Sequence, residues 1–387
     1  MALSKELLKA IRAESAARLD QVCELTIDIC NVPAPTDAEG ERAAFVADLL
    51  RQRGYEPELD SVSNVYARRG SKGGPALLVD AHLDTVFPAG TEINARRESG
   101  WLWGPGIGDN SLSLAAMLTT FDILDALEIE TDVDLVAVAT VGEEGLGNLK
   151  GARAAVDRYQ KPGELAGHLV IDGHVGRVVH VAVGSNRWLA TVNGPGGHSF
   201  GAFGTPSAIH GLGRIIAAIA DIKAPANPKT TFNVGTITGG TSVNTIAASA
   251  SALIDMRSTD AGELEKLSSR VRQIIQTRPG KGLESVIEVV GERPAGGMPQ
   301  SAPMARLAAD AIRWVGLTPE YQASSTNMNI PVSQGVPTIC VGISRGERTH
   351  TIHEHVPVAP IPDGLAQLVR LTVEAAEMLG RESGRGE

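Results

Sequence analysis

The stretch ALLVDAHLD at residues 76–84 decides the fold. Its first four residues are apolar, and the polar residues Asp80, His82 and Asp84 follow at alternate positions. A short run without polar residues is typical of a strand that is buried on both faces of a parallel sheet. Alternate residues of a strand point the same way, so we expect His82 and Asp84 to share one face at its end.

Two more stretches follow the same pattern. Residues 134–141 and 168–171 are largely apolar, and acidic residues follow each, directly at Asp172 and after one glycine at Glu143 and Glu144. Residues 112–127 contain no Gly or Pro and predict a buried helix. Thr36 and Glu39 have the spacing of a capping box, so another helix is expected to begin at Thr36. Alternating helices and buried strands predict an α/β fold with a mostly parallel sheet covered by helices.

The pattern changes near residue 184. Beyond it, three segments alternate apolar and polar residues, as antiparallel strands with one exposed face do. These segments are 188–193, 232–237 and 247–257. Two helical segments accompany them, which predicts a smaller α+β sandwich inserted into a larger domain. The expected parts are 1–184 and 294–387 for the larger domain and 185–293 for the insertion.

The composition excludes several classes of protein. The chain has 387 residues, of which 43% are hydrophobic and 21% charged, so it can bury a core. Its net charge of −10 argues against nucleic acid as a partner, because phosphate contacts need clustered Lys and Arg. Its apolar runs fall far short of the roughly 20 residues that span a bilayer. With no visible secretory signal and no disulfide framework among three cysteines, a cytoplasmic protein is expected.

Two candidate sites lie at residues 82–84 and 104–110. His82 can bind a metal ion while Asp84 accepts its second ring N–H, although a structural His–Asp pair explains the spacing equally well. In the motif GPGIGDN, the carboxylate of Asp109 could bridge two cations at a helix start. Asp109 also suits a helix N-cap. A dinucleotide-binding turn is disfavoured, because the glycines do not follow GxGxxG.

Further candidates follow the other buried strands. Of the adjacent Glu143 and Glu144, one could bind metal and the other take a proton from water, with a solvated acidic turn as the alternative. Asp172 ends the third strand. The tract THTIHEH at 349–355 is either a metal-binding or an exposed loop. Together these residues offer nitrogen and oxygen ligands without cysteine, which suits two divalent cations, most simply zinc.

The order HxDT, GxGDN, GEEG, DG and a late HxxxE resembles a family of dinuclear zinc exopeptidases and amidohydrolases. Its members include peptidase T, carboxypeptidase G, aminoacylase, acetylornithine deacetylase and succinyl-diaminopimelate desuccinylase. The resemblance extends over nearly the whole chain. It implies that the larger domain is catalytic, that residues 185–293 form a lid and dimerisation domain, and that the protein is a homodimer.

The resemblance also implies a role for each motif residue. The implied metal ligands are His82, Asp109, Glu144, Asp172 and His350. Asp109 bridges the two ions, in a family where a cis peptide bond usually follows that residue. Asp84 orients His82, and Glu143 is the general base.

The last ligand requires a choice among the late histidines. His350 precedes Glu354 by four residues, as the family pattern requires, so His350 is the predicted ligand and His353 the reserve. The chain departs from the family at Asn327, where many members have Asp. This difference removes a charge near the site, and it makes Asn327 a candidate for substrate binding.

The expected insertion supplies further candidates. His198, in the motif GHS, resembles the family's histidine that reaches into the partner subunit's site and polarises the scissile carbonyl. Asn244 and Arg257 resemble family residues that hold the substrate or support that site. For Arg257, a structural ion pair with Asp255 or another acid is the alternative.

The predicted function is metal-dependent hydrolysis of an amide bond in a small, carboxylate-bearing peptide, of the exopeptidase, dipeptidase or carboxypeptidase type. Two divalent ions are expected per subunit, most simply zinc, with cobalt and manganese as alternatives. A deacylase of N-acyl amino acids would use the same site. A third possibility is a metal- or ligand-binding protein without catalysis. Neither nucleic acid nor a membrane is expected as a partner.

Overall fold

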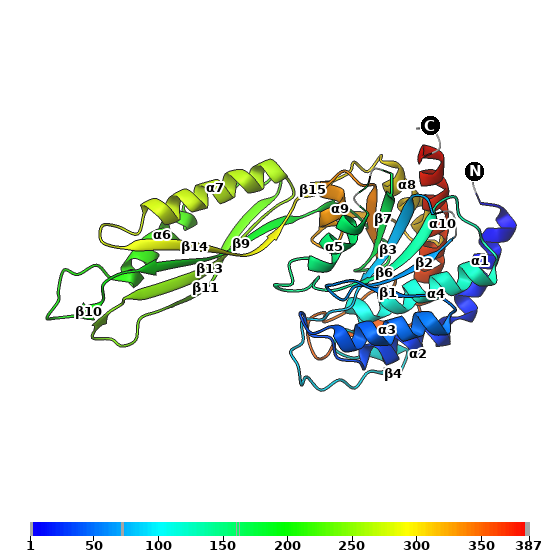
Figure 1. Ribbon diagram of the computed structural model, residues 1–387, viewed down its shortest axis with the longest axis horizontal. Coiled ribbons are helices and arrows are strands. Elements are labelled where there is room, and N and C mark those ends of the chain that lie inside the picture. The colour runs from blue at the N-terminus through cyan, green and yellow to red at the C-terminus, as the bar shows by residue number, and fades with distance from the viewer. Residues whose placement is uncertain (1–2, 71–72, 160, 162, 384–387) are drawn as a thin grey trace. The chain divides into compact units, whose positions relative to one another are not determined.

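Two units make up the computed structural model, which describes residues 3–70, 73–159, 161 and 163–383. The larger unit is formed by residues 1–181 and 297–387, and the smaller by residues 182–296 (Figure 1). Each unit has its own hydrophobic core. The insertion expected at 185–293 falls inside the smaller unit, and its role as a lid and dimerisation domain stays a prediction.

A nine-stranded mixed sheet forms the centre of the larger unit, in the order β1-β2-β6-β3-β7-β17-β8-β15, with β16 paired to β8. The central strands pair in parallel and are β6 (Asp134–Thr140), β3 (Ala76–His82), β7 (Leu165–Ile171) and β17 (Thr338–Val341). Antiparallel pairs join β2 to β6 and β8 to β17. The outer strands are β1 (Glu58–Leu59), β2 (Val65–Arg69), β8 (Arg177–Ala182), β15 (Gly296–Gly297) and β16 (Glu320–Ser324). The predicted α/β fold is confirmed, with the parallel pairing confined to the centre of the sheet.

Helices cover both faces of this sheet (Figure 1). On one face, alternate residues of β3 such as Leu77, Val79 and Ala81 pack against the larger helical layer. That layer consists of α1 (Lys5–Ala17), α2 (Leu19–Cys30), α3 (Gly40–Gln52), α4 (Leu112–Ala126), α8 (Pro303–Trp314) and α10 (Ile361–Ser383). The opposite face is covered by α5 (Lys150–Arg158) and α9 (Asn329–Ser333). Every residue of β3 is buried, as the apolar stretch predicts.

The parallel strands bring the polar motifs to one edge of the sheet. Because β3, β6 and β7 run in the same direction, their carboxyl ends lie side by side. The short irregular turn η1 (Ile107–Ser111) precedes α4 and contains a cis peptide bond between Asp109 and Asn110. The loop that carries the late histidines ends in a small antiparallel sheet that was not predicted. Its strands are β4 (Arg96–Glu98), β5 (Trp101–Trp103) and β18 (His355–Pro357).

One helix begins later than predicted, since α3 starts at Gly40 and not at Thr36. The hydroxyl of Thr36 donates to Asp84 Oδ2 at 2.9 Å. The carboxylate of Glu39 accepts the N–H of Gly142 at 3.0 Å. The predicted capping box is therefore wrong, because groups far away in the sequence bind both side chains that would have formed it.

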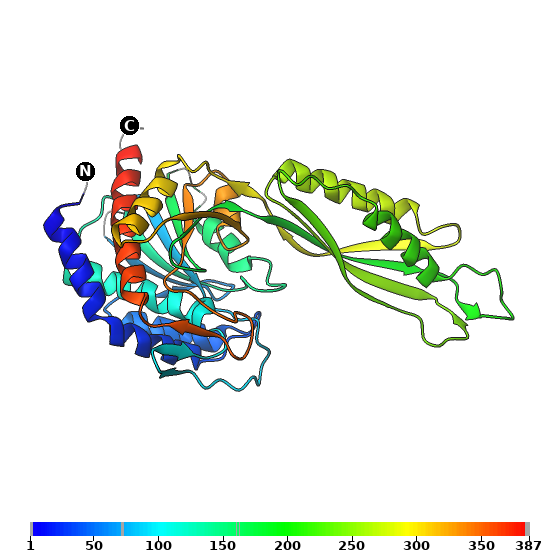
Figure 2. The same ribbon diagram turned by 180° about the vertical axis from the view of Figure 1, so that it is seen from behind.

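The smaller unit is a two-layer α+β sandwich. Its four antiparallel strands, in the order β11-β13-β9-β14, are β9 (Gly184–Asn193), β11 (Thr230–Gly239), β13 (Ser249–Ser258) and β14 (Glu284–Arg293). Helices α6 (Ala208–Ala220) and α7 (Ala261–Thr277) cover one face of this sheet (Figure 2). A separate ribbon pairs β10 (Gly197–His198) with β12 (Thr245–Ile246). Within the described ranges of both units, no helix combines the length and apolar character needed to cross a bilayer.

Candidate metal centre

The five predicted metal ligands meet at the carboxyl edge of the parallel strands. They come from the end of β3, from η1, from the loops after β6 and β7, and from the loop before β18. Three groups of side chains each bring one ligand atom per residue within 4.8 Å of the others. These groups are His82–Asp109–Asp172, Asp109–Glu144–His350 and His82–Glu143–Glu144. The first two share Asp109, as a residue between two cations must.

The two oxygens of Asp109 face different histidines. Oδ1 lies 3.0 Å from Nε2 of His82, and Oδ2 lies 3.1 Å from Nε2 of His350. Burial raises the pKa of Asp109, but the two histidines outweigh burial and hold the pKa well below its usual range. An ionised carboxylate with one oxygen directed to each side has the geometry of a bridging ligand.

A backbone carbonyl fixes the orientation of His82. Its Nδ1 lies 3.0 Å from the carbonyl oxygen of Asp84 and 3.5 Å from Oδ1 of the same residue. Because a carbonyl oxygen can only accept a hydrogen bond, Nδ1 carries a proton, and Nε2 is the atom that faces Asp109. Burial lowers the pKa of His82, but contacts with Asp109 and Asp84 outweigh it and raise the pKa well above its usual value. A cation bound between Nε2 of His82 and Asp109 would replace the proton that these two groups share.

His350 faces two carboxylates. Its Nε2 lies 2.9 Å from Glu144 Oε1, in addition to the contact with Asp109. Hydrogen bonds to Asp109 and Glu144 raise the pKa of His350 to about 10. The alternative ligand, His353, is exposed and belongs to none of the three groups found among the described residues. The geometry therefore brings His350, and not His353, to the site.

The surroundings of Asp172 disfavour its charged form. Burial and the nearby charge of Asp109 raise the pKa of Asp172 to about 7. Ionising a partly buried carboxylate in such a position is costly unless a cation lies beside it. The pKa of Asp172 thus indicates that the cluster as a whole lacks positive charge.

The residues fit two divalent metal ions. Imidazole nitrogens and carboxylate oxygens are the ligands that zinc prefers when cysteine is absent. Two donors bound to one zinc ion at 2.0–2.1 Å stand about 3.3 Å apart at the tetrahedral angle. The contacts of 2.9–3.1 Å between histidine nitrogens and carboxylate oxygens are close to that spacing. The uncompensated carboxylates supply the charge that two cations would balance.

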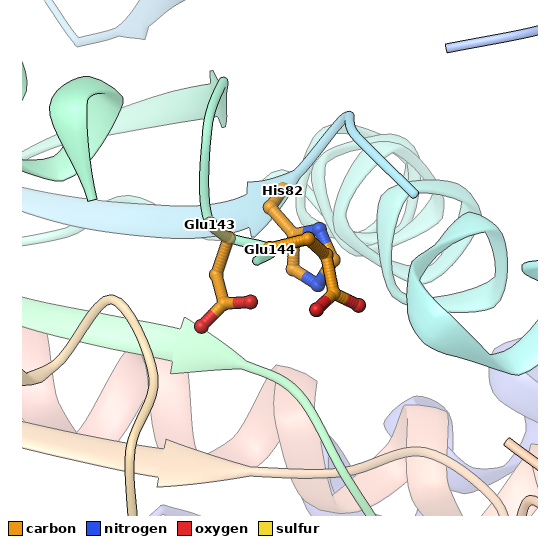
Figure 3. Close-up of side chains that lie close together, drawn as sticks. All are labelled: His82, Glu143 and Glu144. Carbon is orange, nitrogen blue, oxygen red and sulfur yellow. The ribbon is translucent and has the colours of Figure 1, made fainter. Parts of the chain in front are cut away.

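Glu143 and Glu144 leave adjacent positions of the loop after β6, and both project to the same side as His82 (Figure 3). Asp84 holds this loop. Its carboxylate accepts the N–H of Glu143 at 2.9 Å and the N–H of Glu144 at 2.8 Å. The same carboxylate lies 3.5 Å from Nδ1 of His82, and its role in orienting His82 stays a prediction.

The sequence matches the model of peptidase family M20/M25/M40 over residues 78–374. The chain belongs to this family. A succinyl-diaminopimelate desuccinylase of Methylorubrum extorquens is 26% identical over 352 residues, which cover 83% of this chain and 89% of that protein. A probable carboxypeptidase of Aspergillus clavatus is 27% identical over 288 residues, or 66% of each chain. The predicted family, and with it a metal-dependent hydrolase of amide C–N bonds, is confirmed.

Solved structures share the fold of this M20 chain. The aminopeptidase PepT of Bacillus cereus superimposes with a TM-score of 0.77 at 21% identity, covering 92% of this chain and 98% of PepT. A Bacillus subtilis protein described as a dinuclear metal-binding M20 peptidase has a TM-score of 0.70 at 15% identity, covering 92% and 98%. At these identities the likeness shows a common fold.

Glu354 is a site residue whose role the sequence did not reveal. It is buried, and its carboxylate accepts backbone N–H groups from Gly106, Gly108 and Asp109 at 3.1, 2.8 and 2.9 Å. These bonds hold the loop that presents Asp109. Burial and the charge of Asp109 raise the pKa of Glu354 to about 7, although the three N–H groups act in the opposite direction. Its spacing from His350 was the only signal of its importance.

A buried polar network lies beneath the strand ends of the M20 chain. Asp80 Oδ2 lies 3.0 Å from His168 Nε2, and Oδ1 accepts the hydroxyl of Thr140 at 2.6 Å. Asn327 donates to Thr140 Oγ1 at 2.7 Å and to Asp80 Oδ1 at 3.3 Å. Asn327 is only 1% exposed, so its amide braces the strands that carry the ligands. A direct contact of Asn327 with substrate stays a prediction.

The smaller unit holds the other predicted residues. His198 and Asn244 are exposed and adjacent, since the N–H of Ser199 donates to the carbonyl of Asn244 at 3.0 Å. Nδ1 of His198 accepts the N–H groups of Phe200 and Gly201 at 3.2 and 3.3 Å. The ring proton of neutral His198 therefore sits on Nε2, which can donate to a ligand.

Arg257 lies near the far end of β13 from His198, because His198 pairs with Thr245 and β13 begins at Ser249, shortly after β12. It follows Ser249 by eight positions on β13, which corresponds to roughly 26 Å at the rise of a β-strand. Its Nε donates to Asp255 at 2.7 Å, and Arg187 lies 3.2 Å from the other oxygen of that carboxylate. The ion pair foreseen as an alternative is thus present, and Asp255 is shared between two arginines.

Proposed function

We propose that this chain hydrolyses the amide bond of a small substrate that carries a carboxylate, as an exopeptidase, dipeptidase or carboxypeptidase. The observation that carries the proposal is Asp109, whose two oxygens face His82 and His350, with Glu143 within reach of the same cluster. Ligands shared in this way suit a two-metal hydrolase. They would serve little purpose in a metal-binding protein without catalysis.

The proposed ligands are His82, Asp109 and Asp172 for one ion and Asp109, Glu144 and His350 for the other. When bound there, two divalent cations, most simply zinc, would polarise the scissile carbonyl and lower the pKa of the attacking water. The chain's own residues provide the proton transfers. The carboxylate of Glu143 takes a proton from the water and delivers it to the leaving nitrogen. The bond from its backbone N–H to Asp84 keeps Glu143 in place.

Two residues of the smaller unit act on the substrate in this proposal. The Nε2–H of His198 donates to the carbonyl oxygen as negative charge develops there. Arg257 binds the substrate carboxylate. The roughly 26 Å between the two ends of β13 is too long for one small substrate to contact both residues of the same subunit. This distance supports a homodimer in which His198 serves the partner's site.

Deacylation of N-acyl amino acids is the second candidate function, because the chain is similar to a succinyl-diaminopimelate desuccinylase. Turnover of di- and tripeptides compared with N-acetyl and N-succinyl amino acids distinguishes the two. A cytoplasmic location is also proposed. In its support, all three cysteines are buried free thiols.

The role of Glu143 can be tested by Glu143→Gln. We expect kcat to fall by about a hundredfold to ten-thousandfold, because the proton carrier is lost. We expect two metal ions per subunit to remain, measured by elemental analysis of the purified protein. The matched variant Glu144→Gln should lose metal. Loss of metal from Glu143→Gln would instead identify Glu143 as a ligand and contradict its role as the base.

A further inference from the structure

A cavity of about 140 Å³ adjoins the metal centre within the larger unit. Asp109 and Asp172 are among the residues that line it. Leu112 and Val356 provide apolar wall, and Arg177 lines the cavity from the first position of β8. A group held in this cavity would be a part of the same substrate whose carbonyl lies at the metal ions.

Arg177 supplies a positive charge among the residues that line the cavity. The guanidinium of Arg177 forms no ion pair or hydrogen bond with any residue that the structure describes. The same is true of Arg345, which lies near enough to His174 to act on it electrostatically. A partly buried arginine without an acidic partner, aimed at a small cavity, is suited to bind an anionic ligand group.

Hydroxyl groups add to this anion-binding character. Ser113 and Thr349 line the cavity, and within the described ranges neither hydroxyl is bonded to another protein group. Both can therefore donate to a ligand oxygen. The volume corresponds to that of about five water molecules, which is enough for a carboxylate on a two-carbon chain.

We propose that this cavity binds a second carboxylate of the substrate, on a chain of about two carbons, through Arg177. The proposal rests on the proposed function, and it narrows the substrate to compounds with an acidic group close to the scissile amide. Arg257 in the smaller unit and Arg177 in the larger unit would then bind different carboxylates. The acidic group belongs either to an acyl part such as succinyl or to an aspartyl or glutamyl side chain.

Binding to Glu143→Gln, loaded with zinc, tests the cavity without turnover. Isothermal calorimetry compares N-succinylglycine with N-butanoylglycine, which has a methyl group in place of the carboxylate. A second pair, Glu-Gly and Gln-Gly, distinguishes a side-chain carboxylate from an acyl carboxylate. We expect one charged ligand to bind about tenfold to a hundredfold more tightly than its neutral analogue, as a hydrogen-bonded charge does.

Arginine variants test whether the cavity causes the tighter binding of the charged ligand. Arg177→Gln in the same background should remove most of the preference, and Arg177→Lys should keep part of it. Arg345→Gln is the matched control, because Arg345 is near the cavity but does not line it. We expect Arg345→Gln to change the affinity for the charged ligand by less than about threefold. Thermal unfolding verifies that each variant is folded.

The possible results distinguish a failure of the proposed subsite from a failure of the proposed function. Equal affinity for charged and neutral ligands, or an equal loss in Arg345→Gln and Arg177→Gln, would overturn the subsite. Wild-type protein that hydrolyses charged and neutral substrates at the same kcat/KM would likewise overturn it while supporting amide hydrolysis. A preference that depends on Arg177, together with no turnover of any compound by wild type, would uphold the subsite and contradict the proposed function.

Discussion

At the scale of single residues, the candidate centre depends on carboxylate side chains that accept hydrogen bonds from backbone N–H groups of the surrounding loops. Asp84 accepts the N–H groups of Glu143 and Glu144, and Glu354 accepts three N–H groups around Asp109. Each places a ligand-bearing loop without belonging to any of the three ligand groups. Carboxylates in this position raise metal affinity by fixing the ligands in advance.

The role of Glu354 leads to a prediction. In Glu354→Gln, an amide NH₂ group would face the N–H of Gly106, so a hydrogen bond to a charged acceptor is lost. We expect the free energy of unfolding to fall by about 1.5–3 kcal/mol. We expect zinc affinity to fall about tenfold to a hundredfold, measured by competition with a chromophoric chelator.

A nearby glutamate provides the control for this variant. Glu347 is exposed and lies 3.4 Å from His355, outside the ligand groups. Glu347→Gln should therefore leave zinc affinity unchanged. Wild-type zinc affinity in Glu354→Gln would mean that the loop of Asp109 is held by other contacts.

At the scale of elements, the strands were predictable and many contacts between them were not. The apolar runs predicted β3, β6 and β7, and polar residues at or just beyond the carboxyl ends of these strands form part of the candidate ligand cluster, because burial and parallel pairing leave little choice. The capping box at Thr36 failed because Asp84 and Gly142, distant in sequence, bind its two side chains. Local spacing contains no information about such partners.

The late histidine loop illustrates the same limit. The spacing to Glu354 selected His350, which does lie beside Asp109 and Glu144. By contrast, His355 is stacked on Trp103, with ring centroids 4.2 Å apart, in a small sheet that no local pattern predicted. Aromatic pairing between distant strands is a tertiary contact and leaves no periodic signal.

The buried network of Asp80, Thr140 and His168 joins β3, β6 and β7, so a charge added to it should destabilise the sheet. Asn327→Asp would place a second carboxylate next to Asp80, whose Oδ1 is 3.3 Å from the amide nitrogen of Asn327. We expect the free energy of unfolding in denaturant to fall by about 3–5 kcal/mol, as for an uncompensated buried charge.

A paired exchange provides the decisive comparison for the network. The double variant Asp80→Asn/Asn327→Asp again has one carboxylate, and it should recover about 1–3 kcal/mol of the loss. Asn94→Asp, at an exposed position, is the control for the chemical change and should have little effect. Additive losses in the double variant would show that the two side chains do not act together.

At the scale of the whole molecule, the proposal divides one reaction between two units. The larger unit holds the proposed metal ligands and Glu143, and the smaller unit holds His198 and Arg257. Each unit has its own core, so each can present its residues on a rigid support. If His198 acts in the partner's site, a mixture of two inactive variants can recover activity. If His198 acts within its own subunit, the mixture stays inactive.

Mixing inactive variants tests that division. If His198 serves the partner, a dimer of one His198→Ala subunit and one Glu143→Ala subunit has one complete site. Random subunit exchange should then restore about a quarter of wild-type activity, since half of the dimers are mixed and each has one of two sites. Mixtures that stay as inactive as the separate variants would show that His198 acts within its own subunit or not at all.

The metal centre is tested most directly by anomalous X-ray diffraction at the zinc absorption edge, on crystals grown with zinc. We predict two peaks on either side of Asp109, one touching His82 and Asp172 and the other touching Glu144 and His350. A single peak, no peak, or a peak bound by His353 in place of His350 would contradict the assignment of the centre.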